Sequence, residues 1–433
     1  MKKRLFAIIS IVICFASLLS CVGCQEVSVN VVDNVLSSES TDASESATEE
    51  SATEKKTQKK TEKKTEKKTE KQTEAGPIPG VTKPDKSLVP TTYNFVNMAV
   101  SEQQYFKFLG RSKVSSNGLI FDNSCVTLEF QGYMTGDVIV EIKSEANGYG
   151  YGNSFFTVYV DGERSGTRFE VSNGATKKLT VASFEGEYFH TLKIVKQTEF
   201  KWSRAIIKSL EIEGYLINAP AKKNVYIEFL GDSLTTGYGN IGKPGDTPDD
   251  SPKFQDGTKS YAYLAAEALG ADYSMISRSA GGINQCWSNA PIIDYYKKFS
   301  SSSGSEAFNT LLARIPNLIV IHLGANDYNV AKEDGNISNA DKQAFVNGGK
   351  ALINYFRDIY GEDIPIIWAY DPGEGFPDLV KEIMNSFGGE DAGYYTLSLG
   401  WSDAGAGGHP SAKEHENHAT ALVNLITSKN IIK

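Results

Sequence analysis

Three polar residues far apart in the sequence have the types needed for acyl transfer through a serine. Ser233 and His409 can form a pair in which the imidazole takes the hydroxyl proton and makes the serine a nucleophile. An attacked carbonyl becomes an oxyanion, which N–H donors stabilise. The side chain of Asn326 and the backbone of Gly281 or Gly282 can supply such donors. These residues predict nucleophilic catalysis by a serine hydrolase, provided that the fold brings them together.

Each of these residues lies near an element with the pattern of a buried strand or an amphipathic helix. Apolar runs predict strands at Val225–Leu230, Tyr273–Ile276, Asn317–Leu323 and Ile364–Tyr370. Helical spacing predicts helices at Tyr261–Leu269, Phe345–Tyr360, Leu379–Phe387 and Ser411–Ser428. Strands that alternate with helices indicate a three-layer α/β domain with a parallel sheet, in which ligands bind at the carboxyl ends of the strands.

Four short blocks carry the candidate residues. In chain order they are Gly231-Asp232-Ser233-Leu234, Ser279-Ala280-Gly281-Gly282, Gly324-Ala325-Asn326-Asp327 and His409-Pro410-Ser411. Together they resemble the four blocks of the GDSL/SGNH hydrolases, a resemblance that extends from Val225 to the end of the chain.

The resemblance implies a flavodoxin-like SGNH hydrolase domain over residues 220–433, with Ser233 as nucleophile and His409 as general base. It also implies an oxyanion hole made of the Ser233 N–H, a glycine N–H and the Asn326 amide. The block Ser-Ala-Gly-Gly can be aligned in more than one way, so both Gly281 and Gly282 are candidates.

The sequence departs from the superfamily pattern next to the histidine. The superfamily has an aspartate three residues before the histidine, where this chain has Ala406. The nearest upstream carboxylate is Asp403. Either a main-chain carbonyl orients His409, which makes a Ser–His dyad, or Asp403 folds back and completes a triad. We favour the dyad.

Residues 91–219 have an all-β pattern. Short alternating runs separated by Gly, Asn and Ser include Val126–Phe130, Val138–Ile142, Phe155–Val160, Lys178–Val181, His190–Val195 and Ile206–Ile212. Asp161-Gly162 is a typical hairpin turn. The pattern predicts a β-sandwich of the jelly-roll type. The connection at 214–220 is short and partly apolar, so we expect the two domains to be docked.

Both folded parts together resemble carbohydrate esterase family two. The resemblance rests on Gly110-Arg111, Gly118–Asp122, Val158–Glu163 and the extended serine block Glu228–Asn240. It implies a serine esterase, similar to acetylxylan esterases, that removes acetyl groups from xylan, mannan or glucomannan without a cofactor or metal. Two alternatives stay open: an O-acetyl esterase acting on peptidoglycan or host glycan, and a non-catalytic carbohydrate-binding surface lipoprotein.

The N-terminal region has the features of an export signal and a linker. A basic start followed by an apolar run predicts a signal peptide over residues 1–21, and Leu18–Cys21 resembles a lipobox, with Cys24 as a second candidate for lipidation. Residues 22–90 are rich in Ser, Thr, Glu and Lys and predict a solvated linker. We expect an exported protein at the bacterial cell surface that Cys21 anchors to the membrane by lipid; the alternative is a secreted protein with an ordinary cleaved signal.

Composition excludes several other functions. The 433 residues carry 44 Lys and Arg against 53 Asp and Glu, so an acidic chain is not expected to bind nucleic acid. The cysteines offer no zinc-binding spacing, and we interpret His415 and His418 as solvated helix residues and not as metal ligands. No metal, cofactor or obligate oligomer is expected; we expect a monomer.

Aromatic residues near the strand ends are weaker candidates for sugar binding. Trp287 and Tyr296 follow the glycine block, and Phe376 follows the fourth predicted strand. Rings at such positions can stack on sugars, but they can equally pack in the core.

Overall fold

The structure is a computed structural model, and it describes residues 86–147, 151–288, 290–300, 306–309, 314–333 and 335–432. The predicted signal peptide, the lipidation site at Cys21 and almost all of the linker lie outside these residues. Within the described ranges, no helix is long and apolar enough to cross a membrane.

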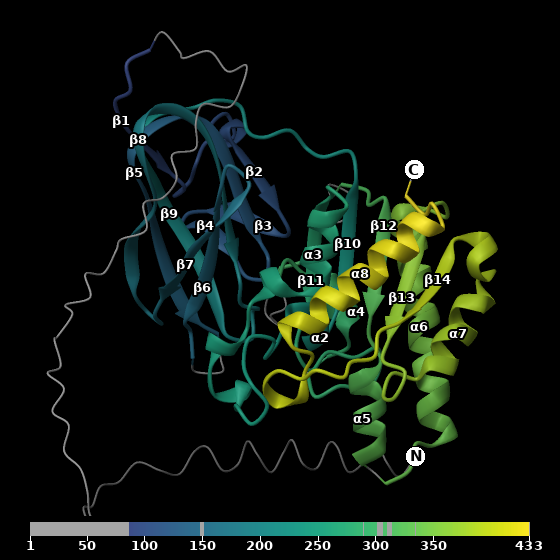
Figure 1. Cartoon of the computed structure of the whole chain (residues 1–433). Coiled ribbons are helices and arrows are strands. Elements are labelled where there is room, and N and C mark those ends of the chain that lie inside the picture. The colour runs from purple at the N-terminus through teal and green to yellow at the C-terminus, as the bar shows by residue number, and fades with distance from the viewer. Residues whose placement is uncertain are drawn as a thin grey trace, which may run out of the picture. The chain divides into compact units, whose positions relative to one another are not determined.

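The first folded part is an antiparallel sheet of nine strands (Figure 1). They are β1 (Pro90–Asn94), β2 (Phe106–Leu109), β3 (Ser112–Ser115), β4 (Gly118–Phe121), β5 (Thr127–Ala146), β6 (Ser154–Val160), β7 (Glu163–Val171), β8 (Thr176–Lys196) and β9 (Ser203–Leu216). Buried and half-buried residues alternate along β5, as expected for a strand with one face on a core. Phe121, Phe130, Val140, Phe156 and Ile194 belong to that core.

The long strands β5 and β8 each replace two short strands that the sequence predicts. Their pairing continues through register shifts between Met134 and Gly136 and between Val138 and Ile139. Such bulges bend a strand without ending it, so a break in the alternation looks like a turn in the sequence. The hairpin between β6 and β7 is as predicted, because Asp161 and Gly162 both have positive φ, 51° and 88°.

The second folded part is a parallel five-stranded sheet with helices. Its strands are β10 (Tyr226–Gly231), β11 (Asp272–Ser277), β12 (Leu318–His322), β13 (Ile366–Tyr370) and β14 (Tyr394–Ser398), in the order β11-β10-β12-β13-β14. The chain leaves β10 to one side for β11 and then crosses to the other side for β12. The end of β10 is therefore the switch point at which α/β proteins place their sites.

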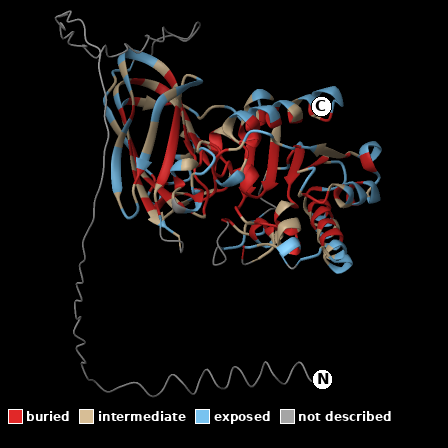
Figure 2. Ribbon diagram, turned by 60° about the horizontal axis from the view of Figure 1, so that its bottom comes forward, coloured by how far each residue is buried: buried red, intermediate tan, exposed pale blue. Residues whose placement is uncertain are grey.

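Helices cover both faces of this sheet, whose strands β10–β13 are buried (Figure 2). The α-helices are α2 (Ser233–Thr236), α3 (Tyr261–Ala268), α4 (Ile292–Tyr296), α5 (Ala325–Glu333), α6 (Asn339–Tyr360), α7 (Pro377–Ser386) and α8 (Ala412–Ser428). Short 3-10 helices lie at Gln103–Tyr105, Pro248–Asp250, Pro252–Phe254, Gly257–Lys259, Gly389–Ala392 and Ala406–Gly408. Helices α3 and α8 share a core with one face of the sheet, and α4, α6 and α7 with the other. The predicted fold class, antiparallel β followed by a three-layer α/β domain, is confirmed.

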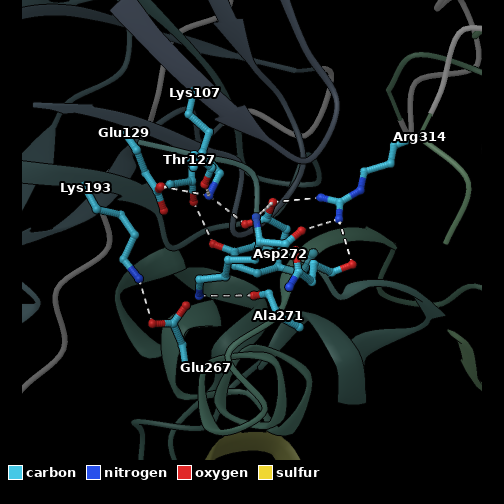
Figure 3. Close-up of polar contacts among 12 residues, drawn as sticks. Lys107, Thr127, Glu129, Lys193, Glu267, Ala271, Asp272 and Arg314 are labelled. Atoms are coloured by element: carbon cyan, nitrogen blue, oxygen red, sulfur yellow. Dashed lines mark hydrogen bonds and ion pairs between the residues drawn. The ribbon is translucent and has the colours of Figure 1, made fainter. Parts of the chain in front are cut away.

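Charged and polar side chains join the two parts (Figure 3). Nζ of Lys107 lies 2.6 Å from Oδ1 of Asp272, whose other oxygen contacts Arg314 at 2.8 Å. Thr127 Oγ1 and Tyr273 OH are 2.7 Å apart, and both are buried. These polar side chains are buried and pair with one another across the two parts, so the two parts are docked, as the short connection predicts.

Candidate active site

Ser233 is held on a tight turn at the end of β10, as the first residue of α2. The carboxylate of Asp232 caps the turn by accepting a hydrogen bond from the N–H of Leu234 at 2.9 Å. Gly231 is required, because a Cβ at this position would lie 2.0 Å from Oγ1 of Thr235. Ser233 keeps 9% of its surface exposed, so its hydroxyl is fixed and still accessible.

His409 faces this hydroxyl. Its Nε2 lies 2.8 Å from Oγ of Ser233, and its Nδ1 lies 3.2 Å from the carbonyl oxygen of Gly407. When Nδ1–H donates to Gly407, the lone pair of Nε2 is free to accept the hydroxyl proton. Burial lowers the pKa of His409, the Gly407 carbonyl raises it, and the positive charge of Lys201 lowers it further. The imidazole is therefore neutral at neutral pH, the form that a general base needs.

Asp403 has a different partner. Its Oδ2 accepts a hydrogen bond from Oγ of Ser411 at 2.5 Å, and its carbonyl accepts the Ser411 N–H at 3.0 Å. Ser411 caps α8, so Asp403 closes the turn that leads into this helix. The structure thus does not place Asp403 as the orienting acid of His409; the Gly407 carbonyl takes that place.

Two backbone N–H groups of the predicted oxyanion hole lack a hydrogen-bond acceptor in the part of the chain that the structure describes. Within the described residues, neither the N–H of Ser233 nor that of Gly282 has a protein acceptor. The N–H of Gly281 donates to the carbonyl of Arg278 at 3.1 Å. Gly282, and not Gly281, is therefore the glycine whose N–H is available to an oxyanion.

Asn326 lies between the serine turn and the glycine block. Its Nδ2 donates to Oδ2 of Asp232 at 3.0 Å and to the carbonyl of Gly281 at 2.8 Å. Both amide hydrogens are occupied in this resting arrangement, so donation to an oxyanion requires that one of these bonds be exchanged. Burial raises the pKa of Asp232 to about 7, with the Leu234 N–H opposing the shift, so a proton on this carboxyl near neutral pH would weaken its hold on Asn326.

Asp327 holds the loop that carries Gly282. Its carboxylate accepts hydrogen bonds from the N–H groups of Ile283, Asn284 and Gln285, each at 2.8 Å. A Cβ on Gly282 would lie 2.1 Å from the carbonyl oxygen of Gln285, so this tight loop also requires glycine.

Two of the three aromatic candidates for sugar binding are core residues. Tyr296 is fully buried, and its hydroxyl donates to Oε2 of Glu228 at 2.6 Å. Phe376 is 6% exposed and packs against Phe345, with ring centroids 5.0 Å apart. The proposed role of both in sugar binding is wrong, because burial leaves no ring face for a sugar. Trp287 is 50% exposed and stays a candidate.

The two histidines of α8 are not solvated, contrary to the expectation. His415 and His418 are 1% and 3% exposed and lie beside Tyr261, as does the buried His322. Among the described residues, no group of His, Cys, Asp and Glu is arranged to hold a metal ion. Their imidazoles pack around Tyr261, whose hydroxyl lies 3.0 Å from Oγ1 of Thr235 in the serine turn.

The β-sandwich contributes residues that sequence reasoning missed. Glu199 accepts hydrogen bonds from Ser279, the first residue of the glycine block. Trp202 stacks on Tyr238, whose ring lies 4.9 Å from that of His409. Tyr238 belongs to the extended serine block, but no local pattern marks Glu199, since its partner is 80 residues away.

Family models match both folded parts. The model for a GDSL-like lipase/acylhydrolase matches residues 227–374, and the model for a carbohydrate esterase 2 N-terminal domain matches residues 108–220.

The chain is 29% identical over 296 residues to a cellulase/esterase, CelE, of Acetivibrio thermocellus, covering 64% of this chain and 34% of that protein. It is 30% identical over 118 residues to an acetylxylan esterase/glucomannan deacetylase of Cellvibrio japonicus, covering 26% of this chain and 32% of that protein. The chain thus spans about a third of the length of these curated relatives.

Solved structures are similar over both parts as well. A family two carbohydrate esterase from Clostridium thermocellum, in complex with cellohexaose, aligns with a TM-score of 0.65 and 27% identity over 75% of this chain and 99% of that one. An acetyl xylan esterase from Butyrivibrio proteoclasticus has the same fold, with a TM-score of 0.68 and 19% identity over 79% of this chain and 99% of that one. Residues 108–220 therefore match the model for a carbohydrate esterase 2 N-terminal domain and residues 227–374 match the model for a GDSL-like lipase/acylhydrolase, the two kinds of domain that the sandwich motifs and the four blocks predict.

Proposed function

We propose that the chain is a serine esterase that removes O-acetyl groups from polysaccharide. The observation that carries this proposal is the 2.8 Å contact between Oγ of Ser233 and Nε2 of His409, at the edge of the sheet where two backbone N–H groups are open. A paired hydroxyl and neutral imidazole beside free donors suits attack on an ester carbonyl.

The reaction follows from this arrangement in two steps. Ser233 Oγ attacks the acetyl carbon while its proton moves to Nε2 of His409, and the carbonyl oxygen becomes an oxyanion. The N–H groups of Ser233 and Gly282 stabilise that oxyanion, with Asn326 as a third donor once its amide exchanges partners. The intermediate collapses, the sugar oxygen leaves with the proton from His409, and an acetyl-enzyme remains.

Water completes the cycle. His409, neutral again, takes a proton from water as the water oxygen attacks the acetyl-enzyme. Collapse of the second intermediate returns the proton to Oγ of Ser233 and releases acetate. The Gly407 carbonyl accepts from Nδ1–H throughout, which keeps the ring in one tautomer and stabilises the imidazolium.

The substrate class is supported by the similar proteins. One relative is named an acetylxylan esterase and glucomannan deacetylase, and one similar structure holds cellohexaose. We therefore favour acetylated xylan, mannan or glucomannan over acetylated peptidoglycan or host glycan. Such polymers are too large to enter a cell, which fits export of this chain.

Turnover on a panel of acetylated substrates tests the proposal. Wild type should release acetate from 4-nitrophenyl acetate and from acetylated xylan or glucomannan, and Ser233→Ala should lose this activity. If acetate were released faster from O-acetylated peptidoglycan than from the plant polysaccharides, the substrate would be peptidoglycan instead. Binding of the glycans without any release of acetate would favour the non-catalytic, carbohydrate-binding alternative.

The lipid anchor is a separate part of the proposal. Its support is the sequence around Cys21, which resembles a lipobox after a basic and apolar leader. Metabolic labelling with an alkyne fatty acid should label the wild type and not Cys21→Ala. If the label persisted in Cys21→Ala and disappeared in Cys24→Ala, the second cysteine would be the lipidated residue.

We also expect the exported protein to be a monomer, which size-exclusion chromatography with light scattering would test.

A further inference from the structure

A short segment of the β-sandwich reaches the proposed active site. It consists of residues 197–202, between the end of β8 at Lys196 and the start of β9 at Ser203. Its backbone is held on both sides: Nζ of Lys196 donates to the carbonyl of Thr198 at 2.5 Å, and the Glu199 N–H donates to Oε1 of Gln255 at 3.3 Å. The side chain of Glu199 is thereby fixed, and it is 1% exposed.

The carboxylate of Glu199 bonds to one residue of the α/β domain through both oxygens. Oε2 accepts the N–H of Ser279 at 2.8 Å, and Oε1 accepts the Oγ–H of the same residue. Charge-assisted hydrogen bonds in a water-free setting are strong, and removal of the carboxylate would leave a buried N–H without a partner.

Ser279 begins the loop that ends in the open N–H of Gly282. Between them Ala280 has φ of 65°, in the left-handed region that alanine rarely adopts, and Gly281 turns back to Arg278. Such a backbone conformation persists only where its surroundings hold it. The downstream end of the loop is held by Asp327, through the N–H groups of residues 283–285.

Two carboxylates therefore clamp this loop, one from each domain. Asp327 lies on α5 next to Asn326, and Glu199 comes from the sandwich. Because the Gly282 N–H lies between the two clamped ends, its direction depends on both.

We propose that Glu199 is a positioning residue for the esterase reaction: from the β-sandwich it holds the 279–282 loop so that the Gly282 N–H points to the developing oxyanion. This inference rests on the proposed function. It makes the sandwich a part of the catalytic unit, in addition to any part it plays in binding sugar.

Three variants of the full chain separate positioning from docking. Glu199→Ala removes both hydrogen bonds to Ser279. Glu199→Gln keeps the shape and can restore both, since its Oε1 can accept the N–H and its Nε2 can donate to Oγ. Lys107→Met removes the contact between the domains at Asp272 and leaves the glycine loop untouched, so it is the control for docking.

We expect Glu199→Ala to lower kcat on 4-nitrophenyl acetate by about ten- to a thousandfold, the upper bound being the loss of one oxyanion donor. KM should change by less than about threefold, because the loop acts on the transition state. The acid limb of the pH profile should not move, since His409 is unaffected. Glu199→Gln should recover most of kcat, and Lys107→Met should lose thermal stability without losing kcat.

Other results would overturn the inference. It fails if Glu199→Ala keeps kcat within about twofold of wild type, or raises KM alone. It also fails if Lys107→Met loses as much kcat at an equal loss of thermal stability. Where Glu199→Ala does not fold, Ser279→Ala is the test: it removes the Oγ–H bond and keeps the N–H bond to Glu199, so kcat should fall by more than about twofold but by less than the loss of one oxyanion donor, and unchanged kcat counts against the clamp. Lack of turnover by the wild type would instead contradict the proposed function and the inference with it.

Discussion

Oγ of Ser411 donates a hydrogen bond of 2.5 Å to the carboxylate of Asp403. This bond engages the carboxylate nearest upstream of His409 in the cap of α8. The imidazole is oriented instead by the carbonyl of Gly407, 3.2 Å from Nδ1. A carbonyl fixes the tautomer as a carboxylate does, but it carries no full charge to stabilise the imidazolium.

Asp403→Asn should therefore keep kcat/KM within about tenfold of wild type, equivalent to about 1.4 kcal/mol of barrier. The main effect should be a lower thermal midpoint, because the cap of α8 is weakened. Asn326→Ala gives the scale, since loss of one oxyanion donor lowers kcat by about a hundred- to a thousandfold. A larger loss in Asp403→Asn than in Asn326→Ala would contradict the dyad.

The acid limb of kcat/KM should lie below pH 6.5, the ordinary pKa of histidine. His409 acts as a base only when it is neutral, and burial lowers its pKa, so activity should persist into mildly acidic solution. The measurement is kcat/KM on 4-nitrophenyl acetate between pH 4 and 8. A limb above pH 7 would contradict the burial of the imidazole.

Two charges near His409 should move this limb in opposite directions. The charge of Lys201 lowers the pKa of His409 and that of Asp249 raises it, and the two side chains form an ion pair of 2.7 Å. Lys201→Met should shift the limb to higher pH, and Asp249→Asn should shift it to lower pH. Shifts of the same sign in both variants would show that packing around Tyr238, and not charge, sets the pKa.

The sequence predicts the parallel sheet and the residues at its strand ends because both depend on local patterns. The apolar runs that end near Leu230 and Leu323 are buried strands, and the turn after each strand is short. The sequence therefore predicts, to within a few residues, which polar side chain lies at the end of each strand. The strand β14 was missed, because its side chains are only partly buried and its sequence has no continuous apolar run.

Side-chain partners between distant segments could not be predicted in this way. The sequence leaves Tyr296 open between a sugar-binding ring and a core residue and suggests a solvated His415, yet Glu228 and Tyr261 give each a buried polar partner. The choice between Gly281 and Gly282 depends on one backbone bond to Arg278, which the sequence does not indicate. The contact of Glu199 with Ser279 depends on the docking of two domains.

Trp287→Ala should raise KM for acetylated polysaccharide and leave 4-nitrophenyl acetate turnover within about twofold. Its ring is 50% exposed and follows the glycine block in the sequence, so we expect it to contact the sugar chain and not the ester. Phe376→Leu is the matched control, because that ring is buried and its loss should lower stability and not polysaccharide affinity. Equal KM for wild type and Trp287→Ala on the polymer would remove Trp287 from the binding surface.

Three buried histidines should make the protein unstable in acid. Burial lowers the pKa of His322 to about 3 and also lowers those of His415 and His418, with His418 contributing to the shifts of the other two. An unfolded histidine has a pKa near 6.5, so below about pH 6.5 the unfolded chain binds protons that the folded core excludes, and for His322 this continues down to about pH 3. The free energy of unfolding should fall as the pH drops through this range, by up to about 1.4 kcal/mol per pH unit for each such histidine.

His322→Phe tests the contribution of one of these histidines to the pH dependence of stability. Neither ring nitrogen of His322 has a hydrogen-bond partner among the described residues, so the change removes a titrating group without leaving a polar partner behind. Urea unfolding between pH 4 and 8 should show a shallower fall for His322→Phe than for wild type, by about one proton, with the two curves closest at pH 8. Parallel curves throughout would mean that His322 takes up no proton on unfolding, and that its imidazole is charged or solvated in the folded protein.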